Sequence, residues 1–235
     1  MTESSSTSPR LRLPLSFLER PAAADVAEPW LLLLMHGVGS NEADLFGLAP
    51  HMPPAFHVVS LRAPNVLSPD SYAWFSFQVD AAGQRTIDEA QERESRFLVG
   101  EMLTSATQQL GIPQERVVVG GFSQGGIMSL SLLLTQPEKV HAAMVWHSRL
   151  LPQVEGHLAP RDAFEGKALW VSHGTADNVI PLAAAEHMRA FVGKLPIALS
   201  GADFPGGHEI RPAELQQAVA WLQSLVRATG PDQPG

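Results

Sequence analysis

Short apolar runs recur along the chain, and stretches with a helical spacing of apolar residues separate them. Continuous apolar runs predict central strands buried on both faces at residues 29–37, 56–64, 116–122, 140–146 and 168–174, and a weaker run lies at 196–201. The helical spacing predicts helices over about residues 42–48, 87–110, 124–134, 183–195 and 213–228. Because strands and helices alternate, the sequence predicts an α/β domain with a mostly parallel central sheet and helices on both faces.

The longest segment without a clear period is residues 62–85, which follows the second apolar run. Long loops of this kind often cover a binding site. About twenty residues separate the apolar runs at 140–146 and 168–174. This connection is too short for a separate cap domain, so we expect an open site.

The composition supports one globular domain. A chain of 235 residues with 45% hydrophobic content can bury one substantial core. Residues 1–10 and 229–235 have the composition of disordered tails, so the predicted single domain spans residues 11–228.

A net charge of −8 argues against nucleic acid or an anionic membrane surface as a partner. No apolar run is long enough for membrane insertion, and the absence of cysteine fits a cytoplasmic protein. A homodimer is compatible with the sequence.

A serine stands where the apolar run at 116–122 meets the helix predicted at 124–134, in the pattern Gly-Phe-Ser-Gln-Gly. In a G-x-S-x-G turn the serine takes a strained conformation that presents its hydroxyl above the sheet. Gly121 and Gly125 are needed because a Cβ at either position would crowd the strand or the helix. A simple N-cap is the alternative interpretation of Ser123. Strain of about 1–3 kcal/mol is usually retained only where it serves a function, so the turn predicts a nucleophile.

The predicted nucleophile needs a base and an acid, which follow it in the order Asp or Glu, then His, on this type of scaffold. Asp177 follows the apolar run at 168–174, and His208 lies in a glycine-rich loop before the last predicted helix. Both fall at the carboxyl ends of predicted strands, where open parallel sheets bind ligands. Asp162 and Asp203 are alternatives for the acid, but neither directly follows a strong strand.

Two backbone N–H groups are predicted to bind the oxyanion. Gln124 begins a helix, so its N–H points toward developing negative charge. The loop at 36–39 has glycines on either side of Val38 that would let the Val38 N–H point to the same place, while His36 is expected to stabilise the loop. No glycine-rich segment matches a nucleotide motif, and no H-x-x-x-H pair or clustered carboxylate set is present. We therefore expect no cofactor and no metal.

Together these motifs resemble the phospholipase/carboxylesterase family of serine α/β-hydrolases, which includes bacterial carboxylesterases and acyl-protein thioesterases. The resemblance covers about residues 31–226 and rests on LMHGVGSNEADL, AWF, GIPQERVVVGGFSQGGIMSL, HGTADNVIP and GGHEI. It implies the α/β-hydrolase fold, a triad of Ser123, Asp177 and His208, and hydrolysis of carboxylic esters or thioesters without a cofactor. The order of the motifs along the chain predicts the same triad.

Two departures from the family pattern lie around the substrate. Ser76 stands where members commonly have aspartate after the Trp-Phe pair, and Arg149 stands where glycine is usual. The resemblance assigns Trp74 to the site, so we expect Trp74 to wall a pocket for short to medium acyl chains. Arg149 and Leu150 are expected to bind substrate as well. Arg149 would attract a carboxylate or phosphate remote from the ester, with a surface ion pair as the alternative interpretation.

The sequence thus predicts a carboxylesterase that acts on a small-molecule ester through an acyl-enzyme. A thioesterase or a lysophospholipase is an alternative, because all three pass through the same intermediate. A noncatalytic binding module on the same fold is an alternative from another class. A reactive-serine probe distinguishes these, since only a hydrolase is labelled at Ser123.

Overall fold

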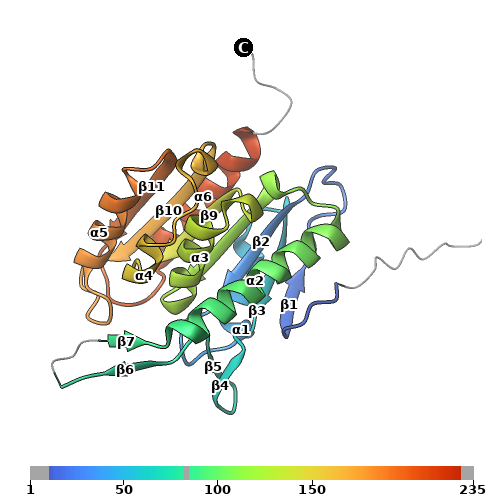
Figure 1. The fold of residues 1–235 in the computed structure, drawn as a ribbon. Coiled ribbons are helices and arrows are strands. Elements are labelled where there is room, and N and C mark those ends of the chain that lie inside the picture. The colour runs from blue at the N-terminus through green and yellow to red at the C-terminus, as the bar shows by residue number, and fades with distance from the viewer. Residues whose placement is uncertain (1–10, 82–84, 229–235) are drawn as a thin grey trace, which may run out of the picture.

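Seven strands form one central sheet in this computed structural model, which describes residues 11–81 and 85–228. The strand order is β1-β3-β2-β8-β9-β10-β11 (Figure 1). The strands are β1 (Phe17–Arg20), β2 (Trp30–Met35), β3 (Phe56–Leu61), β8 (Val117–Phe122), β9 (Ala142–Trp146), β10 (Lys167–Gly174) and β11 (Ile197–Phe204). Neighbouring strands are parallel except β1, which pairs with β3 in the antiparallel direction.

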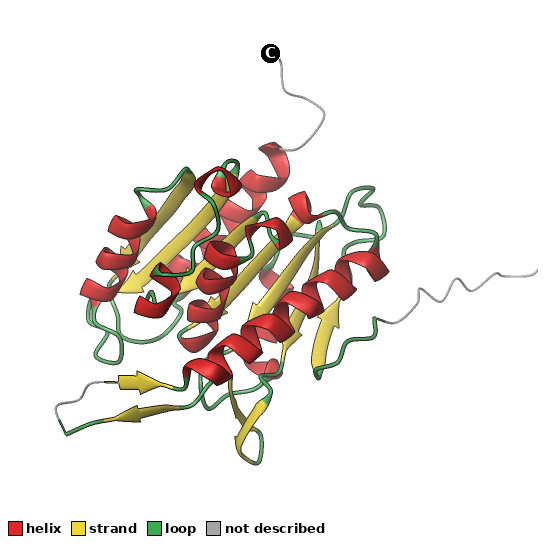
Figure 2. Ribbon diagram, in the orientation of Figure 1, coloured by secondary structure: helices red, strands yellow, loops and turns green. Residues whose placement is uncertain are grey.

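Helices cover both faces of this sheet (Figure 2). They are α1 (Glu42–Phe46), α2 (Glu89–Leu110), α3 (Gln124–Thr135), α4 (Pro152–Glu155), α5 (Leu182–Val192) and α6 (Pro212–Ala228). In the view of Figure 1, α2, α3, α4 and α5 lie in front of the sheet, and α1 and α6 lie behind it. Short 3-10 helices, η1 (Ala49–His51), η2 (Gln114–Arg116), η3 (Pro137–Lys139) and η4 (Arg161–Phe164), complete the connections.

Alternate residues of the central strands enter two separate cores. In β2, Leu31 and Leu33 belong to the core that also contains residues of α2, α3 and α5, whereas Leu32 and Leu34 belong to the core that contains residues of α1 and α6. All four leucines are fully buried. Because helices cover both faces, the strand is apolar at every position, and a continuous apolar run was the correct signal for it.

The predicted strands and helices agree with the structure apart from their ends, but β1, the hairpins described below and the short helix α4 were not predicted. The sequence analysis described residues 62–85 as irregular. That segment and its continuation form two small hairpins, β4 (Asn65–Ser68) with β5 (Ser71–Ala73) and β6 (Phe77–Val79) with β7 (Arg85–Ile87). The predicted tails at 1–10 and 229–235 lie outside the described residues.

The parallel strands bring the loops after β8, β10 and β11 to one edge of the sheet. The connection from β9 to β10, which is wholly described, contains only α4 and η4, so no cap domain interrupts the sheet there. Among the described helices, none combines the length and apolar character needed to cross a bilayer.

Candidate active site

Ser123 connects β8 to α3 with a φ of 54° and a ψ of −114°. Residues other than glycine rarely adopt positive φ values. A Cβ on Gly121 would collide with the backbone of Gly125, and a Cβ on Gly125 would collide with the backbone of Met35 in β2. The hydroxyl of Ser148 donates a 2.7 Å hydrogen bond to the carbonyl oxygen of Ser123. Close packing and this hydrogen bond hold the strained turn in place.

Ser123, His208 and Asp177 form a continuous hydrogen-bonded chain. Oγ of Ser123 lies 2.9 Å from Nε2 of His208, and Nδ1 of His208 lies 2.7 Å from Oδ2 of Asp177. Ser123 and Asp177 are buried, while the His208 side chain keeps 16% of its surface exposed. When Nδ1–H donates to the carboxylate, Nε2 is left to accept the serine proton. The structure thus brings together the three residues that the sequence selected.

Two neighbouring loops hold the acid and the base in register. Beyond the paired ends of β10 and β11, the N–H of Thr175 donates to the carbonyl of Phe204, and the N–H of Ala176 donates to the carbonyl of Gly206, both at 2.9 Å. Gly206 has a φ of 154°, which side chains with a Cβ rarely allow. The backbone hydrogen bonds therefore fix one loop against the other, and with them the separation of the two side chains.

The Asp177 carboxylate is hydrogen bonded through both oxygens. Oδ1 accepts the N–H groups of Val179 at 2.8 Å and Ile180 at 2.9 Å, and Oδ2 accepts from His208. Burial opposes ionisation, but the hydrogen bonds from His208, Ile180 and Val179 outweigh it and lower the pKa of Asp177. Asp177 is therefore charged at neutral pH and fixes the tautomer of His208.

A second buried histidine contacts the same carboxylate. Nδ1 of His147 lies 3.2 Å from Oδ2 of Asp177, and Nε2 lies 3.2 Å from Oε2 of Glu214. Glu214 is fully buried and accepts a 2.6 Å hydrogen bond from the hydroxyl of Ser172. Burial opposes protonation of His147, but Glu214 and then Asp177 outweigh it, so the pKa of His147 is raised. This network links α6 to the triad.

The sequence analysis identified neither His147 nor Glu214 as part of the site. A glutamate in the first turn of a helix is ordinary, because it complements the helix dipole. Only the fold shows that this one turns inward.

Val38 and Gln124 lie beside Ser123 and line the same pocket. Gln124 is the first residue of α3, so its N–H has no acceptor within the helix. In the loop after β2, the N–H of Gly39 donates to the carbonyl of Tyr72, whereas the N–H of Val38 has no hydrogen bond to the described residues. Both predicted donors are thus free to bind an oxyanion on the serine.

The structure corrects the assignment of Trp74 as the wall of the acyl pocket. Trp74 is fully buried, its Nε1–H donates a 2.9 Å hydrogen bond to the carbonyl of His36, and its ring contacts the His36 ring. The next residue, Phe75, lines the pocket at Ser123 instead. A buried indole needs an acceptor for its N–H, and the chain just after β2 provides one. The prediction that Leu150 binds substrate is also wrong, because Leu150 packs in the hydrophobic core.

A narrow pocket of about 30 Å³ opens beside the serine. Its apolar walls are Phe75, Phe77, Ile87, Ile127 and Ile180. The Gln124 side chain positions one wall, because its Oε1 accepts the N–H of Trp74 at 2.8 Å and its Nε2 donates to the carbonyl of Phe75 at 2.6 Å. The residue whose backbone faces the oxyanion therefore also anchors the loop that closes the pocket.

Arg149 lies half-buried between β9 and α4 and lines this pocket. Burial, and then the charge of Arg85, lower the pKa of Arg149. In the part of the chain that the structure describes, no carboxylate forms an ion pair with Arg149, so the surface ion pair considered above is not found there. Of the three predicted substrate-binding residues, Arg149 is the one that the structure places at the pocket.

His36 and the two alternative acids, Asp162 and Asp203, lie outside the triad. Nδ1 of His36 donates to the carbonyl of the next residue at 2.7 Å, and Nε2 accepts the N–H of Ala63 at 3.1 Å, so His36 stabilises its loop. Asp203 forms an ion pair with Arg189 at 2.6 Å. Asp162 lies in η4, before β10 rather than after it.

Three potential metal ligands meet at the site, since ligand atoms of His147, Asp177 and His208 lie within 4.8 Å of one another. The two histidine nitrogens concerned both contact Oδ2 of Asp177. A hydrogen-bonded triad with a supporting histidine accounts for this grouping.

The chain is similar to known esterases and thioesterases. The model of the Phospholipase/Carboxylesterase family matches residues 22–226. Acyl-protein thioesterase 1 of Eremothecium gossypii is 26% identical over 224 residues, which are 90% of this chain and 94% of that relative. A probable carboxylesterase of Oryza sativa subsp. japonica is 33% identical over 123 residues, which are 51% of this chain and 45% of that relative.

Among solved structures, the carboxylesterase of Bacillus cereus superposes with a TM-score of 0.77 at 23% identity, over 90% of this chain and 95% of the other. The predicted α/β-hydrolase fold is confirmed, and so, at the level of the family, is the prediction of a carboxylic ester hydrolase. The matched region begins before β2, ends within α6 and contains every residue of the triad. This chain belongs to the phospholipase/carboxylesterase family.

Proposed function

We propose that the protein hydrolyses carboxylic esters with short to medium acyl chains through an acyl-enzyme on Ser123. The observation that carries the proposal is the hydrogen-bonded chain from Ser123 through His208 to Asp177, with two free backbone N–H groups beside it. Family membership supports the ester chemistry. The predicted cytoplasmic location stays part of the proposal and is supported by the absence of cysteine.

In acylation, Nε2 of His208 accepts the proton of Ser123 as Oγ attacks the ester carbonyl. The carbonyl oxygen becomes an anion, to which the N–H groups of Val38 and Gln124 donate. Asp177 stabilises the imidazolium that forms. His208 then gives its proton to the leaving alcohol, and the acyl group remains on the serine.

In deacylation, water takes the position of the alcohol. His208 removes a proton from the water, whose oxygen attacks the acyl carbon, and the same two N–H groups bind the second oxyanion. The proton on Nε2 returns to Oγ as the carboxylic acid leaves. One water is consumed for each ester bond broken, and no redox step occurs.

The small size of the pocket beside Ser123 supports the proposed preference for slim acyl chains. Its volume of about 30 Å³ next to the serine is comparable to the share of one water molecule in the liquid. An outer cavity of about 440 Å³ shares the lining residues Arg85, Ile87 and Arg149 with it. Each methylene adds about 0.8 kcal/mol of binding only while apolar surface covers it, so kcat/KM should rise over the first few carbons and then fall.

Thioester hydrolysis is a second candidate because one relative is named an acyl-protein thioesterase and aligns over 94% of its own length. A lysophospholipase would use the same triad on longer acyl chains. Both pass through the acyl-enzyme described above, so the triad does not separate them.

A hydrolysis screen with a reactive-serine probe tests the proposal. The probe should label wild type at Ser123 and leave Ser123→Ala unlabelled. Matched oxygen esters and thioesters of increasing acyl length should show a maximum of kcat/KM at short to medium chains. Absence of labelling would favour a binding module, a preference for thioesters would favour a thioesterase, and a maximum at long lipid acyl chains would favour a lysophospholipase.

A further inference from the structure

Two arginines line the serine pocket without an acidic partner. Arg149 follows β9 and Arg85 begins β7, and both belong to the lining of the narrow pocket and of the outer cavity. Among the described residues, neither guanidinium forms an ion pair. Arg85 lies 5.3 Å from the centre of the Phe77 ring. Two like charges on one apolar pocket, one of them half-buried, are costly unless an anion joins them.

The acid that lines the outer cavity is already paired. Glu89 lines the outer cavity, where its carboxylate lies 3.9 Å from Arg93, one turn along α2. Glu89 does not line the narrow pocket at the serine. The inner space is therefore bounded by two cations, by apolar side chains and by the uncharged Ser123 and Gln124, which is a composition that suits a small anionic group on an apolar chain.

The position of His208 indicates whether the acyl half or the leaving group of the substrate lies beside the arginines. His208 must protonate the leaving group, so the leaving group lies on its side of the serine. His208 lines a separate cavity of about 310 Å³ with Phe122 and Ile210, and Asp44 and Glu209 also border that cavity. The arginine pocket is lined by Ser123 but not by His208, so it receives the acyl half.

We propose that Arg85 and Arg149 form a subsite for a carboxylate at the far end of the acyl chain. The preferred substrates are then half-esters of short dicarboxylic acids whose alcohol is uncharged or cationic. Guanidinium groups bind carboxylates through paired, charge-assisted hydrogen bonds, which an uncharged acyl end cannot form. This inference rests on the proposed ester hydrolysis: water and a half-ester give the alcohol, the dicarboxylate and one proton.

The test compares monoethyl esters of succinic, glutaric and adipic acid with the ethyl esters of the corresponding monoamides, which have the same length and no charge. Proton release at constant pH gives kcat/KM for each. Wild type should prefer the carboxylate member of its best pair at least about tenfold, and added salt should reduce the preference.

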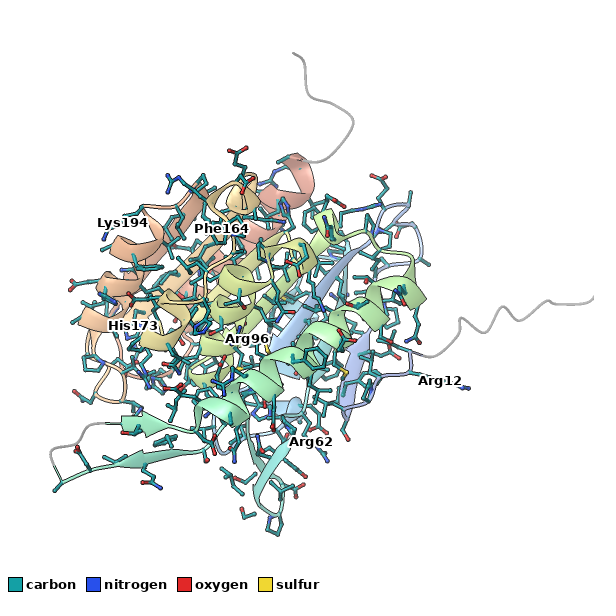
Figure 3. All side chains as sticks on the ribbon, in the orientation of Figure 1. Arg12, Arg62, Arg96, Phe164, His173 and Lys194 are labelled. Carbon is teal, nitrogen blue, oxygen red and sulfur yellow. The ribbon has the colours of Figure 1, made fainter. Side chains whose placement is uncertain are left out.

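Arg149→Met and Arg85→Met should each lower this preference ratio by about tenfold, mainly through KM, and Arg149→Lys should retain part of it. Arg12→Met is the matched control for net charge, because Arg12 is exposed and lies on the side of the molecule away from β7 (Figure 3). Arg85 is exposed, so its variant keeps the test available if Arg149→Met does not fold.

A wild-type ratio near one, or an unchanged ratio in folded Arg149→Met and Arg85→Met, would overturn the subsite. If the monoamide esters are still hydrolysed and Ser123→Ala abolishes that activity, the proposed ester hydrolysis stands without the subsite. If wild type hydrolyses neither series and the serine probe does not label it, the proposed function itself fails.

Discussion

Oδ2 of Asp177 is shared between two histidines with different tasks. His208 lies 2.7 Å away and reaches the serine, while His147 lies 3.2 Å away, is almost fully buried and reaches Glu214 on α6. A third histidine, His173, approaches the same oxygen at 3.5 Å, but its Nε2–H is used by the carbonyl of Ile180. A protonated His147 between two carboxylates would hold the acid in place.

The pH dependence of stability should show whether His147 is protonated between these carboxylates. His147 has a raised pKa in the folded protein, so it binds its proton more tightly there than in the unfolded chain. Its contribution is fully present below the unfolded value of about 6.5 and is lost as pH rises through the folded value. Glu214→Gln should therefore cost about 1.5–3 kcal/mol near pH 6, and the cost should shrink toward pH 9.

Urea unfolding of wild type and Glu214→Gln over that pH range measures the difference. Glu186→Gln is the matched control, because Glu186 is exposed on α5 and should change stability little at any pH. A cost that stays constant with pH would show that His147 does not carry the charge.

At the scale of elements, the site depends on the approach of α3 to β2. Gly125 of α3 leaves no room for a Cβ against the backbone of Met35, whereas Gly156, after α4, is exposed with its nearest neighbour at 3.8 Å. Gly125→Ala should lower the free energy of unfolding by about 1–3 kcal/mol and reduce kcat, because the helix must move away from the sheet. Gly156→Ala should change neither. Equal effects of the two substitutions on thermal unfolding and turnover would contradict this account.

The segment between β5 and β6 should set the acyl-length preference. Phe75 lines the pocket and Trp74 does not, so Phe75→Leu should move the maximum of kcat/KM toward longer acyl chains. Phe97→Leu, a change of the same size at an exposed position of α2, should leave the profile unchanged. A series of ethyl esters of increasing acyl length measures how kcat/KM depends on chain length in both variants. An unchanged profile in a folded Phe75→Leu protein would remove Phe75 from the pocket wall.

For the whole molecule, the sequence predicted the features that depend on a repeated apolar pattern or on a residue's place directly after a strand. The central strands were identified because helices bury both of their faces, and the triad residues were selected by their order and their place after strands. The orientation of Trp74 was missed because it is set by His36 and Gln124, which are 38 and 50 residues away. The contact of His147 with Glu214 spans 67 residues and has no local signal. Such contacts follow from the fold and not from a spacing.

Catalysis by the whole protein should not depend on a metal. The groups that would ligate one are occupied by the hydrogen bonds of the triad. We expect at least about nine-tenths of the ester hydrolysis to remain after dialysis against a chelator, since a serine mechanism needs only the side chains and two N–H groups. Loss of activity that returns with added zinc would indicate a metal-dependent hydrolase.

The most direct test of the account is the turnover of Ser123→Ala on an uncharged short-chain ester. Oγ of Ser123 lies 2.9 Å from Nε2 of His208. Without the hydroxyl the strained turn either persists or relaxes, and neither outcome disrupts the core, so we expect the variant to fold. We predict that kcat falls by about three or more orders of magnitude while the thermal unfolding curve stays close to that of wild type. A folded Ser123→Ala protein that keeps a substantial share of the wild-type kcat would contradict the assignment of the nucleophile and the mechanism built on it.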